Sequence, residues 1–249
     1  MLNFSTLLVG PPGAGKTTAA ATASKFGPVL FLDMDNKIHK MENLQGEIAG
    51  KKIYQWIPEE RLFKGKLGSF VTGATNPQAK FVQQRAKGYQ KLAERIDELE
   101  ANSCMHEGVK MATIVLDSFT SVEEHLKRLL MSANGVSTIS LPLYGTVLTN
   151  YENLLSCILN LKGVNIIIIA HQRPTKDDLT GVISYTPLIS GQMKDKIGKD
   201  FEEVYYLEKT VKTGVAKYEM LTVGSAQKPC RTSRILEARV EPDFGKIYK

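Results

Sequence analysis

Residues 10–17 read Gly-Pro-Pro-Gly-Ala-Gly-Lys-Thr and match the phosphate-binding pattern G-x-x-x-x-G-K-[ST] at every fixed position. Glycines in this loop let the backbone curl tightly enough for successive N–H groups to face phosphate oxygens. We expect the Lys16 ammonium to reach the β- and γ-phosphates and the Thr17 hydroxyl to bind Mg²⁺. The sequence thus predicts an ATP site formed by Gly10, Pro11, Pro12, Gly13, Ala14, Gly15, Lys16, Thr17 and Thr18.

The residues on either side of this loop fit that prediction. Residues 4–9 are a short, mostly apolar run typical of a buried strand, and residues 17–23 are typical of the start of a helix. The N-terminus of a helix favours an anion, so the expected elements present the loop to phosphate.

A second motif is the apolar run 112–116, which ends at Asp117. A carboxylate at the C-terminal end of a strand near the phosphate loop can complete the Mg²⁺ shell, so we expect Asp117 and Thr17 to serve the same ion. Many P-loop machines place a catalytic Glu directly after this Asp, but here the next residue is Ser118. The general base must therefore come from elsewhere in the chain.

Asp35 is the preferred candidate for that base. It follows the apolar run 29–32, where a parallel strand would place it at the same sheet edge as the phosphate loop and in reach of an attacking water. Asp33 is its competitor. At the end of the run 166–170, the Gln172 amide is expected to sense the γ-phosphate and to pass its presence to the loop behind it, whereas His171 is interpreted as structural.

The remaining pattern predicts an α/β fold, with a mostly parallel twisted sheet and helices on both faces, in one domain over residues 1–249. Further strands are expected at 53–57, 203–207 and 216–223, and helices at 78–101, 122–131 and 145–162. Residues 132–145 are rich in Ser, Gly and Pro and are predicted to be a loop, as is the long polar stretch 173–200.

Composition excludes several classes. The longest strongly apolar run, 164–170, is far too short to cross a bilayer, and no leader peptide is visible, so no membrane association is expected. Three scattered cysteines argue for a reducing cytoplasm and against a structural zinc site. The net charge is +6, and residues 51–95 hold ten Lys/Arg against three acids. That excess suits a polyanion such as nucleic acid, or a solvated helix face.

Taken together, GPPGAGKT, FLDMD, TIVLDS and IIIIAHQ stand in the order found in the RecA-like recombinase core, and the chain resembles that family over about residues 4–225. It looks most similar to the compact, phage-encoded ATPases of the Sak single-strand-annealing type. The basic stretch 226–234 resembles the closing motif of that group, in a tail of about 226–249. Two features depart from RecA, which has Glu where this chain has Asp35 and which carries an N-terminal oligomerisation domain.

The resemblance implies single-stranded DNA as a partner, ATP and Mg²⁺ as cofactors, and a homo-oligomer, either a ring or a filament. It also implies two DNA-binding loops, at about 132–146 and 173–192, in which Tyr144, Arg173, Lys176 and Tyr185 are the candidate contacts. Cations that could reach the γ-phosphate of a neighbouring subunit are Lys194, Lys196, Arg231 and Arg234, with ordinary surface charge as the alternative for each. Location in a host cytoplasm follows if the protein is phage-encoded.

The leading hypothesis is a DNA-dependent ATPase that binds single strands and promotes annealing or recombination, with a single-strand-binding protein as a possible partner. Three rivals stay open. One is a small-molecule nucleotide kinase, although residues 120–170 hold one arginine, Arg128, where an arginine-rich lid is expected. The others are a nucleotide-switched loading protein with negligible turnover and a remodelling ATPase of the AAA+ class, which Ser118 disfavours.

Overall fold

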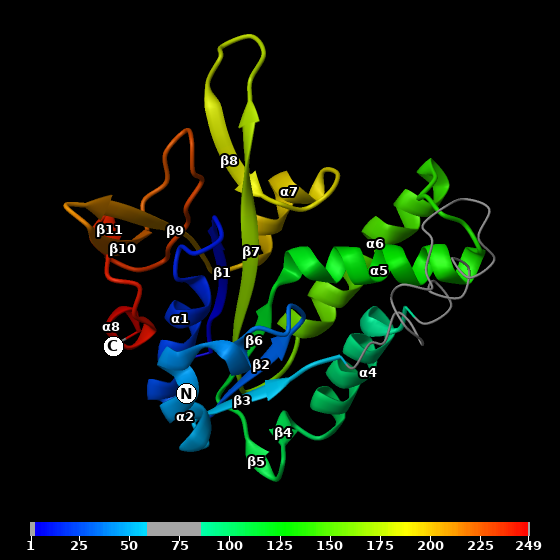
Figure 1. The fold of residues 1–249 in the computed structure, drawn as a ribbon, viewed down its shortest axis with the longest axis horizontal. Coiled ribbons are helices and arrows are strands. Elements are labelled where there is room, and N and C mark those ends of the chain that lie inside the picture. The colour runs from blue at the N-terminus through cyan, green and yellow to red at the C-terminus, as the bar shows by residue number, and fades with distance from the viewer. Residues whose placement is uncertain (1–2, 59–85, 249) are drawn as a thin grey trace.

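The computed structural model describes residues 3–58 and 86–248. Its centre is a sheet whose strands run in the order β11-β10-β9-β1-β7-β6-β2-β3, with β8 paired to β7 outside this path. The five pairings between neighbours from β9 to β3 are parallel, and β10 and β11 add antiparallel strands at one edge. This arrangement confirms the predicted mostly parallel α/β sheet (Figure 1).

The strands occupy the following residues: β1 Ser5–Gly10, β2 Val29–Asp33, β3 Ile53–Trp56, β6 Thr113–Asp117, β7 Asn165–Lys176, β8 Ile183–Pro187, β9 Glu203–Lys212, β10 Val215–Leu221 and β11 Arg239–Val240. A separate small hairpin pairs β4 Met105–His106 with β5 Val109–Lys110. Each strand that the apolar runs predicted is present within a few residues of its expected start. Short buried runs of branched residues are typical of parallel strands covered on both faces.

The helices are α1 Lys16–Ala21, α2 Gln45–Ala49, α4 Gly88–Ala101, α5 Phe119–Asn134, α6 Leu141–Leu159, α7 Met193–Lys196 and α8 Phe244–Ile247. Single 3-10 turns form η1 Thr22–Phe26, η2 Ile38–Lys40, η3 Glu42–Leu44 and η5 Ile197–Asp200. The expected helix 78–101 begins at Gly88, and its predicted part at 78–85 lies outside the described residues, as does most of the basic segment 51–95.

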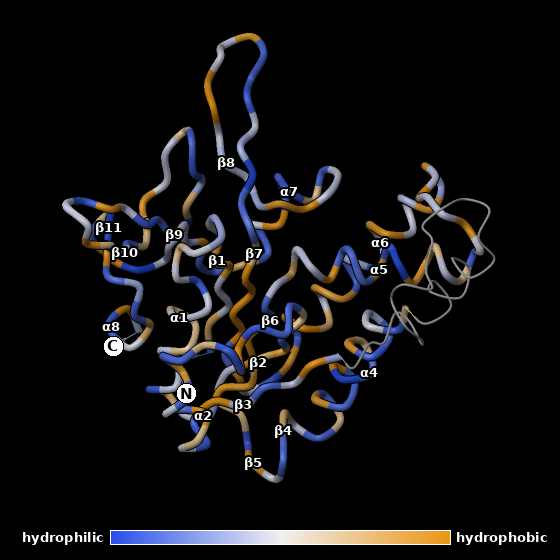
Figure 2. The backbone as a smooth tube through the Cα atoms, viewed as in Figure 1, coloured by the Kyte–Doolittle hydropathy of each residue, from blue (hydrophilic) through white to orange (hydrophobic). Residues whose placement is uncertain are grey.

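Two apolar clusters cover the two faces of the sheet. Because side chains alternate along a strand, Leu7 and Val9 of β1 join the cluster under α4, α5 and α6, while Leu8 joins the cluster with α1, η1 and α8. Figure 1 shows these two groups of helices on opposite sides of the sheet, and Figure 2 shows the hydrophobic centre of β7 between them.

Two predicted loops are corrected by the structure. Residues 132–145 are mostly helical, because α5 continues to Asn134 and α6 already begins at Leu141. Gly135 ends α5 with a φ of 63°, and Pro142 lies in the first turn of α6, where a missing N–H costs no hydrogen bond. The Ser, Gly and Pro that indicated a loop therefore mark the ends of two helices.

The second corrected loop is the polar stretch 173–200. Strand β7 continues to Lys176 and pairs antiparallel with β8, so this region is a hairpin followed by α7 and η5. Asp177 closes the hairpin by accepting backbone N–H groups from Leu179 and Thr180. The hairpin extends well away from the rest of the molecule (Figure 1). At its tip, Leu179 is 98% exposed.

The C-terminal residues pack against the first strand. The ring of Tyr248 stacks on Phe4 with centroids 3.8 Å apart, and its hydroxyl forms a 2.8 Å hydrogen bond with Thr6. Phe244 stacks on the same two rings. Residues 226–248, expected as a basic tail, thus include side chains that are buried against β1.

We expect Tyr248→Ala to lower the free energy of unfolding by about 3 kcal/mol, because a large buried ring is removed and a cavity remains. Tyr248→Phe loses only the hydrogen bond to Thr6 and is expected to cost about 1 kcal/mol. Urea denaturation followed by circular dichroism measures both. Equal stability of Tyr248→Ala and the wild type would show that the C-terminal cluster does not support the sheet.

Candidate nucleotide-binding site

The phosphate-binding loop joins β1 to α1 and contains two glycines that no other residue could replace without strain. Gly15 has a φ of 88°, in the left-handed region, directly before Lys16. At Gly10, a Cβ would lie 2.8 Å from the carbonyl oxygen of Leu207 on β9. The loop therefore packs tightly on the sheet and leaves its N–H groups at the N-terminus of α1.

Lys16 is buried, and its side chain folds over the loop. Its Nζ donates to the carbonyl oxygens of Gly10 at 2.9 Å and Pro11 at 2.8 Å, and it lies 3.5 Å from Nδ1 of His171. Burial lowers the pKa of Lys16 to about 8, against the opposing effect of Asp117. Burial and the charge of Lys16 also lower the pKa of His171, which favours a neutral imidazole beside this ammonium.

Thr17 and Asp117 meet as the sequence predicted, although β1, which leads into the helix that carries Thr17, is not adjacent to β6, which ends at Asp117. The Thr17 hydroxyl donates to Oδ2 of Asp117 at 2.6 Å, and β7 lies between β1 and β6. Burial raises the pKa of Asp117 to about 6, the bond from Thr17 opposes the rise, and the nearby charges of Asp33 and Asp35 add to it. A hydroxyl and a carboxylate oxygen at this spacing are hard ligands that suit Mg²⁺.

Within residues 3–58 and 86–248, no group of three or more His, Cys, Asp or Glu side chains could hold a metal ion by itself. That fits Mg²⁺ in nucleotide sites, which binds through one or two protein ligands together with phosphate oxygens.

Asp33 and Asp35, the two competing carboxylates, have different environments. Asp33 is fully buried and accepts the backbone N–H groups of Asp35, Lys37 and Ile38 and the amide of Gln55 at 2.7–3.1 Å. Its oxygens are therefore occupied in shaping the loop after β2. This geometry favours Asp35 over Asp33 as the carboxylate that could act on a water.

Asp35 lies between a cation and the first turn of α5. Its Oδ2 is 2.6 Å from Nζ of Lys37, and Oδ1 accepts a hydrogen bond from the hydroxyl of Ser121. Burial opposes ionisation of Asp35, but the hydrogen bonds from Lys37 and Ser121 outweigh it and lower the pKa of this carboxyl. Asp35 is therefore an ionised carboxylate at neutral pH.

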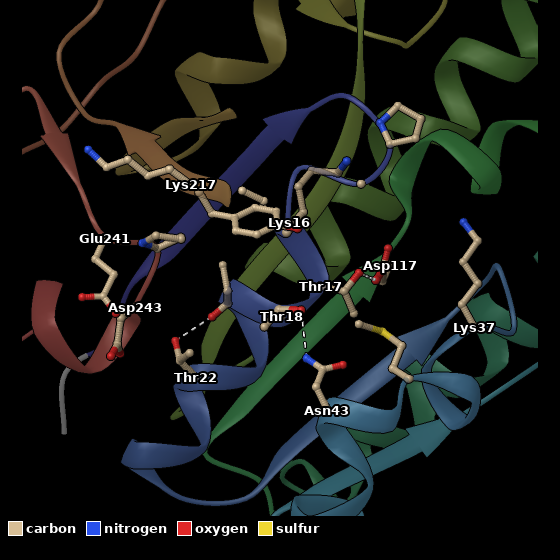
Figure 3. Close-up of a pocket in the computed structure, with 18 of the residues that line it drawn as sticks. Lys16, Thr17, Thr18, Thr22, Lys37, Asn43, Asp117, Lys217, Glu241 and Asp243 are labelled. Carbon is tan, nitrogen blue, oxygen red and sulfur yellow. Dashed lines mark hydrogen bonds between the residues drawn. The ribbon is translucent and has the colours of Figure 1, made fainter. Parts of the chain in front are cut away.

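A cleft of about 1020 Å³ surrounds the phosphate-binding loop. Figure 3 shows Thr17 and Asp117 between two walls, with Lys37 on one side and Lys217, Glu241 and Asp243 on the other. The sequence reasoning missed the residues of both walls. They are Lys37, Met41 and Asn43 on one side and Ala216, Lys217, Tyr218, Glu241, Pro242 and Asp243 on the other. Two features of the sequence bear on the second wall: the strand-like alternation of side chains in β10 and the proline at position 242.

His171 contributes to the lining of this cleft, and Gln172 is not among its lining residues. Gln172 follows on β7 opposite Pro187 of β8, and its buried Oε1 has no hydrogen-bond partner in the described part of the chain. The structure thus places His171 in the lining of the cleft, and the sensor role of Gln172 stays a prediction.

The candidate DNA contacts lie on different elements. Tyr144 is on α6, where Lys127 lies 6.0 Å from its ring centroid, rather than in a loop. Arg173 and Lys176 are on β7, and Tyr185 of β8 lies opposite Pro174, so it shares a face of the hairpin with Lys176 and not with Arg173. Tyr185 is half-buried, with Lys228 lying 4.9 Å from its ring centroid. The structure thus places these three residues on one hairpin, with Arg173 on the opposite face, and leaves Tyr144 apart from them.

The four candidate trans-acting cations do not line the cleft of their own chain. Arg234 lies over the ring of Tyr248 at 4.0 Å, and Arg231 donates to the carbonyl of Lys199 at 3.2 Å. Lys196 donates to Gln192 at 2.8 Å within the short helix α7, which also carries Lys194. The two arginines are therefore engaged in packing the C-terminal segment.

A family model described as an AAA domain matches residues 2–233, which is most of the chain. The chain belongs to the AAA domain family. It is therefore an ATPase domain of the P-loop type, and the predicted α/β fold class with a mostly parallel sheet is confirmed by the strand order. Ser118 disfavours a remodelling ATPase of the AAA+ class, and the match to an AAA domain does not test that activity. Among curated proteins, none matches the sequence.

Three solved structures are similar to this AAA domain at low identity. A prototypical ATPase from the type III secretion system of pathogenic bacteria is 11% identical over 83% of this chain and 52% of its own, with a TM-score of 0.48. The flagellar accessory protein FlaH from Methanocaldococcus jannaschii is 9% identical over 88% and 76%, with a TM-score of 0.42. A KaiC-like protein from Pyrococcus horikoshii OT3 is 15% identical over 92% and 83%, with a TM-score of 0.44. The AAA domain thus spans about half the length of the secretion ATPase.

No helix in the described part of this AAA domain is long and apolar enough to pass through a membrane.

We expect Mg²⁺-dependent nucleotide binding to weaken as the pH falls through about 6, because the raised pKa of Asp117 lets a proton compete with the cation there. Titration of a fluorescent ATP analogue with Mg²⁺ at a series of pH values measures the effect. Asp117→Asn serves as the control, because the remaining pH dependence in this variant comes from protonation of the nucleotide itself. It should bind the Mg²⁺–nucleotide weakly and with a shallower pH dependence than the wild type. Parallel curves for the two proteins would contradict the assignment of Asp117.

Proposed function

We propose that this AAA domain hydrolyses ATP and binds single-stranded DNA, and that it promotes strand annealing or recombination. The observation that carries the proposal is the path of β7. This strand runs beside the phosphate-binding loop, contributes His171 to the cleft and then continues into the hairpin that carries Arg173 and Lys176. One strand thus connects a nucleotide site to a projecting hairpin that carries Arg173 and Lys176, with Asp177 and Asp178 following at its turn.

The positions of the charged groups favour one direction for the nucleotide. Lys37 lies at one end of the cleft, which suits the γ-phosphate, and Asp35 lies behind it as the partner of its ammonium. The sugar and base would then extend past Thr18 and Thr22 toward Tyr218 and the segment 241–243. The Tyr218 ring approaches Gly15, since a Cβ there would lie 3.2 Å from it, so a base in this wall could stack on an aromatic face.

Hydrolysis in this arrangement needs little covalent chemistry from the protein. Lys16 and the backbone N–H groups of the loop would stabilise charge on the phosphates, and Lys37 adds a second cation from the same chain. Asp35 would orient the attacking water and accept its proton. Thr17 and Asp117 would hold Mg²⁺, which when bound supplies charge neutralisation at the phosphate oxygens.

The hairpin supports the DNA-binding part of the proposal. Arg173 and Lys176 offer cations for phosphates along β7, and Tyr185 offers a ring. Tyr185 is half-buried, so we assign it a smaller share of the binding than the two cations. Tyr144 stays in the proposal as a separate contact on α6.

The four trans-acting cations form the assembly part of the proposal, in which a ring or filament supplies charge to a neighbouring subunit's γ-phosphate. All four stay in the proposal, although Lys196, Arg231 and Arg234 already have partners in their own chain. A single-strand-binding protein is a further proposed partner.

The kinase alternative is less well supported. Residues 120–170, where a phosphate-covering lid was sought, are occupied largely by α5, α6 and the start of β7. A nucleotide-switched loader is the main competitor. It would bind ATP with negligible turnover, so the rate of ATP hydrolysis distinguishes it from our proposal.

The first test is ATP hydrolysis with and without single-stranded DNA, with Lys16→Ala as the control for contaminating ATPases. We expect at least a tenfold rise in kcat with DNA, which lowers the barrier by about 1.4 kcal/mol, and no activity in Lys16→Ala. Hydrolysis that is indifferent to DNA would overturn the DNA-dependent function and favour a partner-driven ATPase.

The hairpin is tested by Arg173→Ala/Lys176→Ala, with Lys162→Ala as a matched charge removal outside the hairpin. We expect weaker single-strand binding and a smaller salt dependence, by roughly 0.7 in log K against log salt for each phosphate that the variant no longer binds. Filter binding or fluorescence anisotropy at several salt concentrations measures both. Unchanged binding by the double variant would remove the hairpin from the interface.

The proposed stacking of the nucleotide base on Tyr218 is tested by Tyr218→Ala and Tyr218→Phe. Removal of the ring should raise the KM for ATP by roughly tenfold, since base–aromatic stacking is worth about 1–3 kcal/mol, whereas Phe keeps the face and the affinity. Steady-state kinetics give both constants. Equal KM values for Tyr218→Ala and the wild type would show that the nucleotide base does not stack on Tyr218.

A further inference from the structure

The first turn of α5 supplies a second set of contacts to Asp35 that the sequence reasoning did not anticipate. The Ser121 hydroxyl donates to Oδ1 of Asp35, and the Ser118 hydroxyl lies 3.4 Å from Oδ2. The two serine hydroxyls are 2.9 Å from each other. Two short side chains at the start of α5 therefore meet a carboxylate from the loop after β2.

This turn is itself held firmly. The backbone N–H of Ser121 donates to the carbonyl of Ser118 at 3.1 Å. Phe119, between them, is fully buried and stacks on Tyr151 of α6 with ring centroids 4.0 Å apart, and the Tyr151 hydroxyl donates to the Phe119 carbonyl. The backbone at Ser121 is therefore fixed, and its short side chain holds the hydroxyl in a defined place, which a long flexible side chain would not do.

The other partner of Asp35 offers less control over its orientation. The Lys37 side chain is 61% exposed and has four rotatable bonds, so its ammonium can follow the carboxylate through many orientations. The terminal torsion of an Asp side chain is broad on its own. The hydroxyls of Ser121 and Ser118 come instead from a fixed turn, and the Ser118 contact is long at 3.4 Å, so the bond from Ser121 is the best placed to hold the carboxylate in one orientation.

We propose that Ser121 is a positioning residue for ATP hydrolysis, which orients the Asp35 carboxylate toward the attacking water. The inference rests on the proposed function, in which Asp35 is the general base. A base must lie within hydrogen-bond reach of the proton that it abstracts, and a misplacement of about 1 Å can cost about 100-fold in rate. Ser121 touches neither nucleotide nor water in this scheme and acts through Asp35.

The test is steady-state hydrolysis by Ser121→Ala, Ser121→Thr and Ser121→Cys. We expect Ser121→Ala to lower kcat about tenfold with a change of less than about twofold in KM, because positioning affects the transition state more than nucleotide binding. Ser121→Thr keeps the hydroxyl and should restore most of the rate. Ser121→Cys keeps the size but is a weak donor, so it should resemble Ala.

Ser132→Ala makes the same change on α5 at a distance from Asp35 and serves as the matched control. Thermal melting and binding of a fluorescent ADP analogue establish whether each variant is folded and binds nucleotide. If Ser121→Ala reduced kcat, nucleotide affinity and melting temperature together, and Ser121→Thr did not restore the rate, Ser121 would have a structural role and the proposal would be overturned.

A double-mutant comparison separates this inference from the proposed function. Asp35→Asn should lower kcat about 100-fold or more to a measurable residual rate while keeping nucleotide binding, and Asp35→Asn/Ser121→Ala should be no slower than that residual rate, because Ser121 acts only through that carboxylate. A kcat of Asp35→Asn close to that of the wild type would overturn the assignment of the base. The expected loss of kcat in Asp35→Asn together with wild-type kcat in Ser121→Ala would overturn the positioning role alone.

Discussion

A buried carboxyl side chain, that of Asp33, organises the loop beside the nucleotide cleft. Its carboxylate lies at the end of β2 and accepts three backbone N–H groups and one side-chain amide. A buried carboxylate is costly unless its oxygens are satisfied in this way. Since the N–H donors belong to Asp35, Lys37 and Ile38, satisfying Asp33 determines the path of the loop that places Asp35 beside α5 and Lys37 in the wall of the cleft. The residue at position 33 therefore positions the side chains of Asp35 and Lys37 through hydrogen bonds to their backbone N–H groups.

Local patterns in the sequence were sufficient for the strands and the phosphate-binding loop. Fixed glycine spacing around Lys16 and short apolar runs ending in Asp33, Asp117 or His171 report on backbone conformation within a few residues, and the structure follows them. Asp117 and Thr17 could be paired in advance because the carboxyl ends of parallel strands meet at one edge of a sheet.

What the sequence did not indicate depends on contacts between distant segments. Tyr218 and the segment 241–243 line the cleft only because β10 and the C-terminal residues fold back beside the phosphate-binding loop. Ser121 could not be paired with Asp35 in advance, because its hydroxyl is aimed by the packing of Phe119 on Tyr151. The loop predictions at 132–145 and 173–200 failed for a different reason, since Pro142 and Asp177 serve as helix and hairpin signals as readily as they serve irregular loops.

The pairing of β1 has a consequence for how the protein is made. β1 is synthesised well before its neighbours in the sheet, β7 and β9, and Thr6 bonds to Tyr248, 242 positions later. Such non-local contacts form slowly, because a long chain must be closed before they are gained. The nascent chain therefore carries its phosphate-binding sequence without a nucleotide site until these later segments have been made. ATP can stabilise the fold only from that point on, and a chain interrupted before β7 would leave β1 as an exposed apolar strand for chaperones or proteases to recognise.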